Sequence, residues 1–306
     1  MFPGFQKYRI FAQAARRAIL SYSREMAYYF RAKITLPVHE DNRLLLIRKR
    51  THHLERCLFK PGAYVGNFAE SVHAELVELL QTTPDIPKRL LHWTKKVMGE
   101  YEGMSGACAC PMMQENVHVH QPAVDPGHLL RLMRARRTRR FWLNEPLTDE
   151  QRAKITEASQ LTPSSCNRQP LSLIFVEEPE LKKFITGAIG GGYQFFNDAP
   201  AIIVAVSDGR DYRYPDDRVT PYAEAGAAIQ NIYLVCETMG LGACWGSFTS
   251  FNNVGDEAEV RRRLGIPDTH LIVAALAVGR SNQFVCSIPR DEPHARFSIN
   301  RFPEGK

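Results

Sequence analysis

Long apolar runs are missing from this chain of 306 residues, and no stretch approaches the roughly 20 apolar residues that a membrane-spanning helix needs. The first 32 residues also lack the uninterrupted apolar segment of a secretory signal peptide. Basic residues interrupt that stretch at Lys7, Arg9, Arg16, Arg17, Arg24 and Arg31. We therefore expect neither a transmembrane segment nor a secretory leader.

Cysteine is scarce and irregularly spaced. The seven cysteines, at positions 57, 108, 110, 166, 236, 244 and 286, are odd in number and lack the dense spacing of a secreted disulfide scaffold. A reducing, cytoplasmic location is therefore expected. Cys108 and Cys110 could join His118 and His120 around zinc, but this spacing matches none of the common zinc patterns, and an iron–sulfur cluster needs more nearby cysteines. We predict no metal site.

Several motifs that bind nucleotides or carry nucleophiles are also absent. The glycines at positions 187 and 190–192 do not have the G-x-G-x-x-G spacing of a dinucleotide-binding fold and do not stand between a strand and a helix start. Neither a P-loop nor a G-x-S-x-G nucleophile elbow occurs. These absences argue against a Rossmann fold, a P-loop nucleotide hydrolase and an esterase.

The net charge of +6 is unevenly distributed. Residues 1–50 hold eleven lysines and arginines against Glu25, Glu40 and Asp41, which gives +8 and leaves −2 for the rest of the chain. A basic segment could contact nucleic acid or anionic lipid. Apolar residues nevertheless recur at helical spacing from Phe5 to Ile19, which favours an amphipathic helix packed on the rest of the protein. We expect no nucleic-acid partner.

The first 125 residues are predicted to be mostly helical. One helix is expected over residues 5–32, and residues 43–48 are too few to assign to a strand or a buried helix. Asn67 and Glu70 form the cap of a helix that follows them, and a further helix is expected from Pro87 to about Gly99. Residues 102–126 lose this periodicity and form the predicted linker.

From residue 126 to about 290, helices and short strands alternate, which indicates a layered α+β or α/β domain. Asp125 and Pro126 begin one helix, whose apolar side comprises Leu129, Leu130, Leu132 and Met133. Thr148 caps another, with Gln151 completing a capping box. Central strands are predicted at 171–176 and 200–206, and a buried strand or turn at 241–247. Further helices at 224–239 and 256–264 precede a strand at 270–278.

Two polar clusters could bind a ligand. If the helix ends near Thr138, then Arg136, Thr138 and Arg140 alternate along an extended segment and can point to one side, offering two guanidinium groups and a hydroxyl to a phosphate. Arg134, Arg137 and Arg139 would then face solvent or a subunit interface. The segment 163–170 adds small hydroxyls and amides that can bond the carbonyls and ring nitrogens of a planar heterocycle.

These clusters resemble elements of the FMN-dependent nitroreductase family. RRTRRFW at 136–142 resembles R-R-S-x-R-x-[FY], and LTPSSCNRQP at 161–170 resembles A-P-S-x-x-N-x-Q-P-W, although Leu171 replaces its tryptophan. EPL at 145–147, NDAP at 197–200, GAAIQNIYL at 226–234 and GLGACWGS at 240–247 follow in the family's order. HLERCL at 53–58 faintly resembles a segment of longer relatives.

The resemblance implies a three-layer α+β fold with a central mixed sheet, over residues 126–306, and a homodimer that holds FMN at its interface. Residues 1–125 would be an N-terminal extension. The candidate cofactor residues are Arg136, Arg137, Thr138, Arg140, Pro163, Ser164, Ser165, Asn167, Trp245, Gly246, Ser247 and Arg290. The first cluster would hold the phosphate and ribityl chain, the loop would reach the partner's flavin, and Arg280 and Arg296 compete with Arg290 for the late basic position.

The activity implied by the resemblance is hydride transfer from NADH or NADPH through FMN to a nitroaromatic, quinone or similar small acceptor, with ping-pong kinetics. No catalytic side chain is assigned, and Ser247 is an outside candidate for a donor near the flavin. Two alternatives stay open at this point. One is a specialised flavin enzyme of the same fold, namely a dehydrogenase, a dehalogenase or a flavin-consuming enzyme. The other is a non-catalytic scaffold with a basic N-terminal docking segment.

Overall fold

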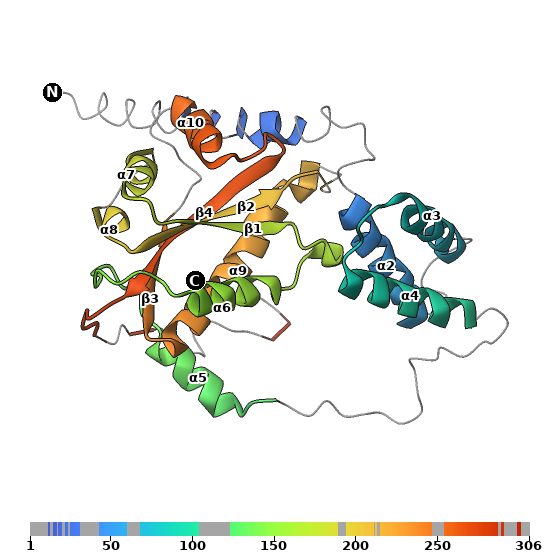
Figure 1. Cartoon of the computed structure of the whole chain (residues 1–306), viewed down its shortest axis with the longest axis horizontal. Coiled ribbons are helices and arrows are strands. Elements are labelled where there is room, and N and C mark those ends of the chain that lie inside the picture. Colours follow the sequence, from blue (N-terminus) through green and yellow to red (C-terminus); the bar gives the residue numbers. More distant parts are fainter. Residues whose placement is uncertain are drawn as a thin grey trace.

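The computed structural model describes residues 12, 15–16, 18–19, 22–23, 25–30, 43–59, 68–103, 123–188, 194–210, 212, 215–246, 254–286, 289–290 and 299–300. A bundle of three helices lies beside a larger body built around a sheet (Figure 1). In the part of the chain described, no helix is long and apolar enough to cross a membrane.

The three-helix bundle has a hydrophobic core of its own. It comprises α2 (Arg43–Phe59), α3 (Phe68–Thr82) and α4 (Lys88–Gly103). The core residues are Ile47, Leu54, Leu58, Val72, Leu76, Leu90, Val97 and Met98. Residues 43–48, which the sequence left unassigned, are helical because Ile47, Leu54 and Leu58 recur on one buried face of α2. Inside the bundle, the hydroxyls of Thr51 and Thr94 share a hydrogen bond of 2.9 Å.

The larger body contains a four-stranded sheet in the order β1-β2-β4-β3. Its strands are β1 (Leu171–Val176), β2 (Ala201–Asp208), β3 (Leu241–Gly246) and β4 (His270–Arg280). The four strands pair antiparallel, and the sheet is mixed only through an isolated parallel bridge between Thr138 and Ala243. The strand at 171–176 was expected to be central but lies at the edge, which explains why it is only partly buried while β2 is buried throughout.

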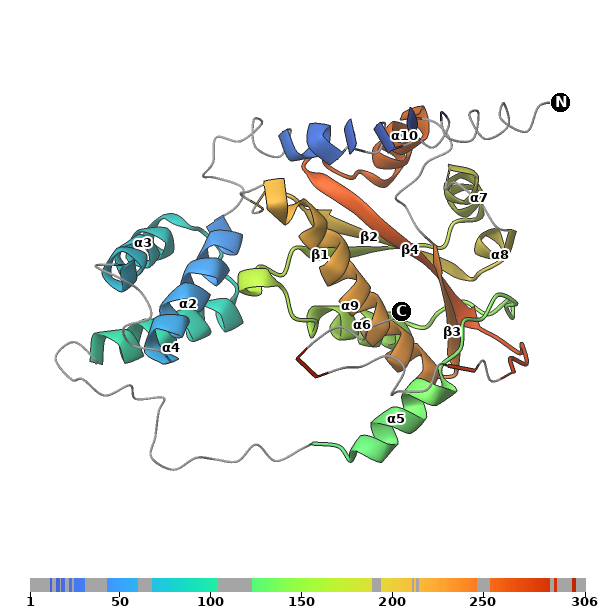
Figure 2. The ribbon, with the colours of Figure 1, turned by 180° about the vertical axis from the view of Figure 1, so that it is seen from behind.

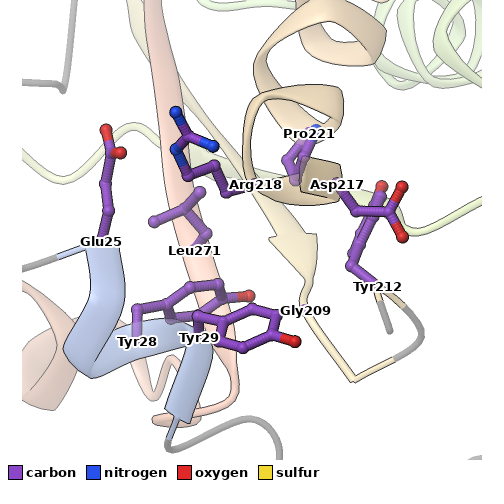
Figure 3. Close-up of a pocket in the computed structure, with 9 residues that line it drawn as sticks. All are labelled: Glu25, Tyr28, Tyr29, Gly209, Tyr212, Asp217, Arg218, Pro221 and Leu271. Atoms are coloured by element: carbon purple, nitrogen blue, oxygen red, sulfur yellow. The ribbon is translucent and has the colours of Figure 1, made fainter. Parts of the chain in front are cut away.

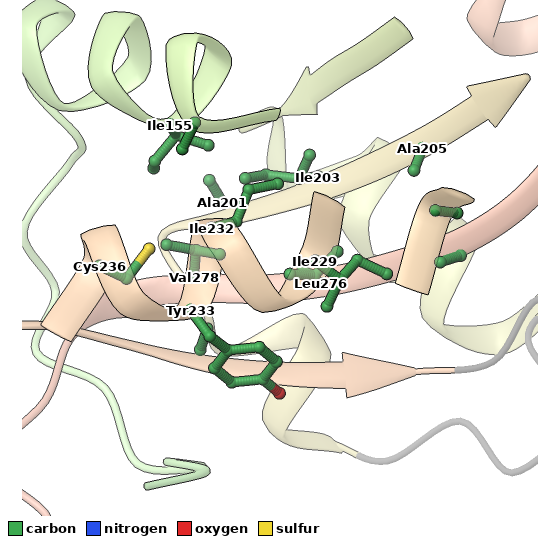
Figure 4. Close-up of a cluster of buried hydrophobic side chains, with 14 of the residues drawn as sticks. Ile155, Ala201, Ile203, Ala205, Ile229, Ile232, Tyr233, Cys236, Leu276 and Val278 are labelled. Atoms are coloured by element: carbon green, nitrogen blue, oxygen red, sulfur yellow. The ribbon is translucent and has the colours of Figure 1, made fainter. Parts of the chain in front are cut away.

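Helices cover both faces of this sheet, giving the predicted three layers (Figure 2). On one face, α6 (Asp149–Gln160) and α9 (Thr220–Thr238) pack against β2 and β4, as the cluster around Ile155, Ile203 and Ile232 shows (Figure 4). On the other, Ile185, Phe196 and Val260 cover the sheet. They belong to α7 (Pro179–Ala188), α8 (Gln194–Asn197) and α10 (Val254–Leu264). Alternate residues of β2 enter the two cores, as the pleat of a buried strand requires.

The predicted helix caps at 125 and 148 are confirmed. Asp125 accepts a hydrogen bond from the backbone N–H of His128 at the start of α5 (Pro126–Ala135), and Thr148 and Gln151 form both bonds of a capping box. The sequence missed α7 and α8. The apolar side of α5 named from the sequence is not covered in the single chain: α5 has no buried residue, and Leu129, Leu130 and Met133 are each at least 40% exposed.

The described part of the first predicted helix is helical at residues 25–30 and packs on the sheet-containing body rather than on the bundle. The Tyr28 hydroxyl donates to the backbone oxygens of Thr269 (2.7 Å) and Ser207 (3.2 Å). Tyr28 and Tyr29 line a pocket together with Gly209 and Tyr212 (Figure 3). A packed helix is therefore found around Tyr28, whereas Ile19, one of the residues on which the prediction rested, is 65% exposed and Phe5 lies outside the described residues. Most of the predicted linker also lies outside them.

Candidate functional site

The arginine cluster leaves α5 as an extended segment beside the edge strand β3. Arg136 caps the C-terminal end of α5, and Thr138 forms the parallel bridge with Ala243. The guanidinium carbon of Arg136 lies 5.1 Å from the ring centroid of Tyr233 on α9. Because the hydroxyl of Tyr233 accepts the backbone N–H of Trp245 at 2.7 Å, Arg136, Tyr233 and Trp245 form one contiguous surface.

Tyr233 is a neutral hydrogen-bonding group at this position. Burial is the main reason that its pKa is raised, and the nearby Cys244 acts in the same direction. Hydrogen bonds from the Trp245 backbone and the Thr138 side chain, together with the charge of Arg136, oppose that rise without cancelling it. The phenol therefore stays protonated at neutral pH while its oxygen serves as an acceptor for two other parts of the site.

The prediction that Arg136, Thr138 and Arg140 share one side holds for the first two only. Arg140 lies with its guanidinium carbon 5.7 Å from the ring centroid of Phe195, and a side-chain hydrogen bond links it to Cys244. Cys244 belongs to the second core, on the opposite face of β3 from Ala243. Arg136 and Arg140 therefore flank the end of β3 from two sides.

Of the three arginines expected to face solvent or a subunit interface, Arg134 is exposed, whereas Arg137 and Arg139 are partly buried within the chain. Arg137 turns back to donate to the backbone oxygens of Arg134 and Arg136. Arg139 donates to the backbone oxygen of Gln283 at 2.6 Å and lies 3.7 Å from a carboxylate oxygen of Glu237.

This distribution suits an anionic ligand. Within the described residues, neither Arg136 nor Arg140 forms an ion pair with a carboxylate, whereas Arg139 lies beside Glu237. A guanidinium offers five N–H donors in a planar arrangement that matches the oxygens of a phosphate. Each of these two guanidinium groups therefore suits the phosphate end of FMN, although they approach the end of β3 from different faces.

Trp245 and Gly246 provide a flat surface next to these donors. Trp245 is 49% exposed, and its ring tip lies over Gly226, where an added Cβ would be 3.6 Å from Cη2. Gly246 packs so closely on Phe196 that an added Cβ would be 2.5 Å from its ring. Gly226 on α9 therefore leaves room for the tip of the half-exposed indole, and an exposed aromatic ring is a surface on which a planar ring can stack.

The second cluster, the 163–170 loop, is ordered by its own polar groups. Ser164 Oγ accepts the backbone N–H of Gln169 at 2.9 Å, and Asn167 Oδ1 accepts the Gln169 side-chain amide at 2.9 Å. The Ser164 hydroxyl hydrogen and the Asn167 amide hydrogens remain as donors. Pro163 and Ser165 are exposed. The loop can therefore present donors to a ligand rich in carbonyls and ring nitrogens.

A buried carboxylate that the sequence did not single out connects this loop to α9. Glu224 accepts the backbone N–H of Ser165 at 2.7 Å and the hydroxyl of Tyr212 at 2.8 Å. Burial raises the pKa of Glu224, and these two hydrogen bonds and the charge of Arg168 oppose that rise. A carboxylate among the small residues of a buried helix start is unusual, and that signal could have identified it.

The remaining predicted positions are scattered or lie outside the described residues. Arg290 is exposed, Arg280 lies 3.3 Å from Glu145, and Arg296 and Ser247 are outside the described part, as are Cys108, Cys110, His118 and His120. Among the described residues, no group of three or more histidine, cysteine, aspartate or glutamate side chains could hold a metal ion. His53 packs against Phe68 inside the bundle.

The two clusters contact the same helix, α9, but lie at different positions along it. Glu224 contacts the loop near the start of α9, and Tyr233 contacts Arg136 nine residues later. At 1.5 Å per residue, this corresponds to about 14 Å along the helix axis. Within one chain, the loop and the arginine cluster therefore present two separate ligand surfaces.

Comparison with known proteins agrees with this architecture. The model of the Nitroreductase family matches residues 133–193 and 189–280. A protein of Archaeoglobus fulgidus assigned to the NADH dehydrogenase and NAD(P)H nitroreductase group is 29% identical over 174 residues, covering 56% of this chain and 92% of the relative. The FMN reductase [NAD(P)H] of Bacillus subtilis is 29% identical over 121 residues, which are 35% of this chain and 48% of that protein.

The fold is also found in solved structures. The NADPH:FMN oxidoreductase of Vibrio harveyi, solved in complex with NAD+, superposes with a TM-score of 0.51 at 23% identity and covers 57% of this chain and 78% of that one. The matched region contains the sheet, its covering helices and both polar clusters, while the α2–α4 bundle precedes it. Through residues 133–280, the chain belongs to the nitroreductase family.

Proposed function

We propose that this protein is an FMN-dependent NAD(P)H oxidoreductase that reduces a nitroaromatic, a quinone or a similar small acceptor. The observation that carries the proposal is the position of Arg136 over the ring of Tyr233, whose hydroxyl accepts the backbone N–H of the half-exposed Trp245. Arg140 adds a second guanidinium on the other face of β3. Relatives named for flavin reduction and for NAD(P)H nitroreductase activity support the same chemistry.

Bound FMN would supply the capacity to accept a hydride from a nicotinamide and to pass electrons to a second substrate. The chain's own residues bind and orient the ligands. Arg136 and Arg140 would hold the phosphate, Thr138 would contact the adjoining polyol, and Trp245 with Gly246 would lie along the ring. Because one exposed face would receive donor and acceptor in turn, ping-pong kinetics are expected.

The working unit in this proposal is a homodimer. The donors of the 163–170 loop and those around Arg136 lie at different positions along α9, so one ring system bound by both would draw on two chains. The exposed apolar residues of α5 supply a surface for such an association. Residues 126–306 would form the FMN-binding domain. Residues 1–125 would form a mostly helical extension, which contacts that domain through the hydrogen bond from Tyr28 to the backbone oxygen of Thr269.

Titration of the purified protein with FMN, followed by reduction with NADH or NADPH, tests this proposal. We expect flavin absorbance that co-elutes with the protein and is bleached by a nicotinamide under anaerobic conditions. The double variant Arg136→Ala/Arg140→Ala should lose FMN retention at least 100-fold, since two charge-assisted phosphate contacts are removed. Arg262→Ala, on the exposed side of α10, is the matched control. Retention of FMN by the double variant would place the phosphate elsewhere.

A further inference from the structure

Glu224 joins two segments that are remote in the sequence. Its Oε1 accepts the backbone N–H of Ser165, 59 residues away, and its Oε2 accepts the hydroxyl of Tyr212, on the segment that follows β2. Glu224 is only 9% exposed. Both oxygens of a buried carboxylate are thus occupied by donors from different parts of the fold.

The segment held by Glu224 has an unusual backbone. Cys166, Asn167 and Gln169 all have left-handed φ values, between 52° and 55°, although none of them is glycine. Residues with side chains persist in this conformation when the surrounding structure over-determines it. The conformation of the 163–170 loop therefore depends on the contacts that hold it from outside.

Those contacts come from three sides. Asn231 of α9 donates to the Thr162 hydroxyl at 3.1 Å, where the loop begins, and α2 of the bundle lies against Ser165–Asn167. Within the loop itself, the buried Arg168 places its guanidinium carbon 5.1 Å from the Tyr212 ring centroid. Among these supports, Glu224 is the carboxylate that bonds the backbone at the start of the left-handed stretch, through Ser165.

Tyr212 extends this arrangement to the N-terminal helix. The same tyrosine that donates to Glu224 lines the pocket shared with Tyr28 and Tyr29 (Figure 3). The charged and titratable groups that act on Glu224 are Arg168, Asp217 and Tyr212. The tyrosine that donates to Glu224 therefore faces a pocket that the N-terminal helix also lines.

We propose that Glu224 is a positioning residue, which holds the 163–170 loop in the conformation that presents its donors to the flavin through the Ser165 and Tyr212 hydrogen bonds. The second half of this statement rests on the proposed function. The first half concerns the loop alone and can be tested in protein without flavin.

The test compares Glu224→Ala, Glu224→Gln and Tyr212→Phe with wild type in the full chain. Glu157→Gln, which removes an exposed carboxylate from the neighbouring α6, is the matched control. Hydrogen exchange of the peptide covering 163–170 is measured in flavin-free protein. FMN dissociation constants and the visible circular dichroism of bound FMN are measured in parallel.

In Glu224→Ala we expect exchange in the loop to rise at least tenfold, with little change in β2 and β4, and the FMN dissociation constant to rise at least tenfold. Glu224→Gln keeps one oxygen that can accept from Ser165, so it should restore part of both properties. Tyr212→Phe should give an intermediate effect, and altered circular dichroism of the remaining bound flavin should accompany each loss.

Unchanged loop exchange in all three variants would overturn the proposal. So would a uniform rise of exchange throughout α9 and the sheet, since that pattern marks a purely structural role. If Glu224→Ala fails to fold, Glu224→Gln and Tyr212→Phe test the proposal, by whether exchange rises in the loop and whether the rise is confined to it. If wild type binds no FMN, the proposed function fails, while the exchange data still decide whether Glu224 holds the loop.

Discussion

The guanidinium of Arg136 lies over the ring of Tyr233, with 5.1 Å between its central carbon and the ring centroid. The pair joins the end of α5 to the middle of α9, and the Tyr233 hydroxyl carries the contact on to the backbone of Trp245 at 2.7 Å. A single side chain thus links Arg136 to Trp245, the two residues proposed to contact the same ligand.

Tyr233→Phe should separate these two contacts, because it keeps the ring under Arg136 and removes the hydroxyl. The backbone N–H of Trp245 then loses its acceptor, at a cost of about 1–3 kcal/mol in the free energy of unfolding. Urea denaturation measures this loss, and FMN affinity should fall with it. Tyr101→Phe, on α4, is the control and should change stability by less than about 0.5 kcal/mol. Equal effects in the two variants would contradict the assignment.

Two glycines near Trp245 should respond oppositely to alanine. In Gly246→Ala the new methyl would be 2.5 Å from Phe196, so strand or ring must move, and we expect a loss of stability of about 1–3 kcal/mol with weaker FMN binding. In Gly226→Ala the new methyl would be 3.6 Å from the Trp245 ring, in ordinary contact, and helix propensity favours alanine by up to about 1 kcal/mol. Thermal melting of both variants, with and without FMN, checks this contrast.

His53 should make the stability of the protein depend on pH. Burial, followed by the charges of Arg50, Lys49, His52 and Arg56, lowers its pKa from 6.5 to about 4. Between pH 4 and pH 6.5, the unfolded chain therefore binds a proton at this histidine and the folded chain does not. Stability should fall as the pH drops from about 6.5 towards 4. Above pH 6.5 the contribution of the neutral His53 to stability is fully present.

Urea midpoints at pH 7 and pH 5 measure this effect. His53→Gln removes the titrating group and should flatten the decline, whereas His92→Gln, on the exposed side of α4, should retain it. A decline of the same size in wild type and His53→Gln would assign the pH dependence to other groups.

The apolar side of α5 should control association. Leu129 and Leu130 are 44% and 46% exposed in the single chain, and a charge at each should oppose burial of this surface against a second copy. Leu129→Glu/Leu130→Glu is expected to shift the protein from dimer to monomer in sedimentation experiments and to lower FMN retention. Lys183→Glu, an exposed position on α7, serves as the control. A double variant that stays dimeric would show that the interface lies elsewhere.

Much of the local structure follows from the sequence by itself. The capping box of Thr148 and Gln151 involves residues three positions apart, and the apolar period of α3 needs only one helix face, so short windows predict both. The buried strand at 201–208 and the turn at Gly240, whose φ is +68°, are equally local. The two polar clusters were predicted for the same reason, because their residues are adjacent in the chain.

Only the tertiary structure decided what those clusters contact. Arg136 meets Tyr233 of α9, Arg139 lies beside Glu237, and Ser165 is held by Glu224, all across separations that no helical or strand period encodes. The order of the strands likewise placed 171–176 at an edge, although its composition suits a central position. Such contacts depend on how α9 packs across the sheet, because packing selects partners by shape and burial among residues that are distant in sequence.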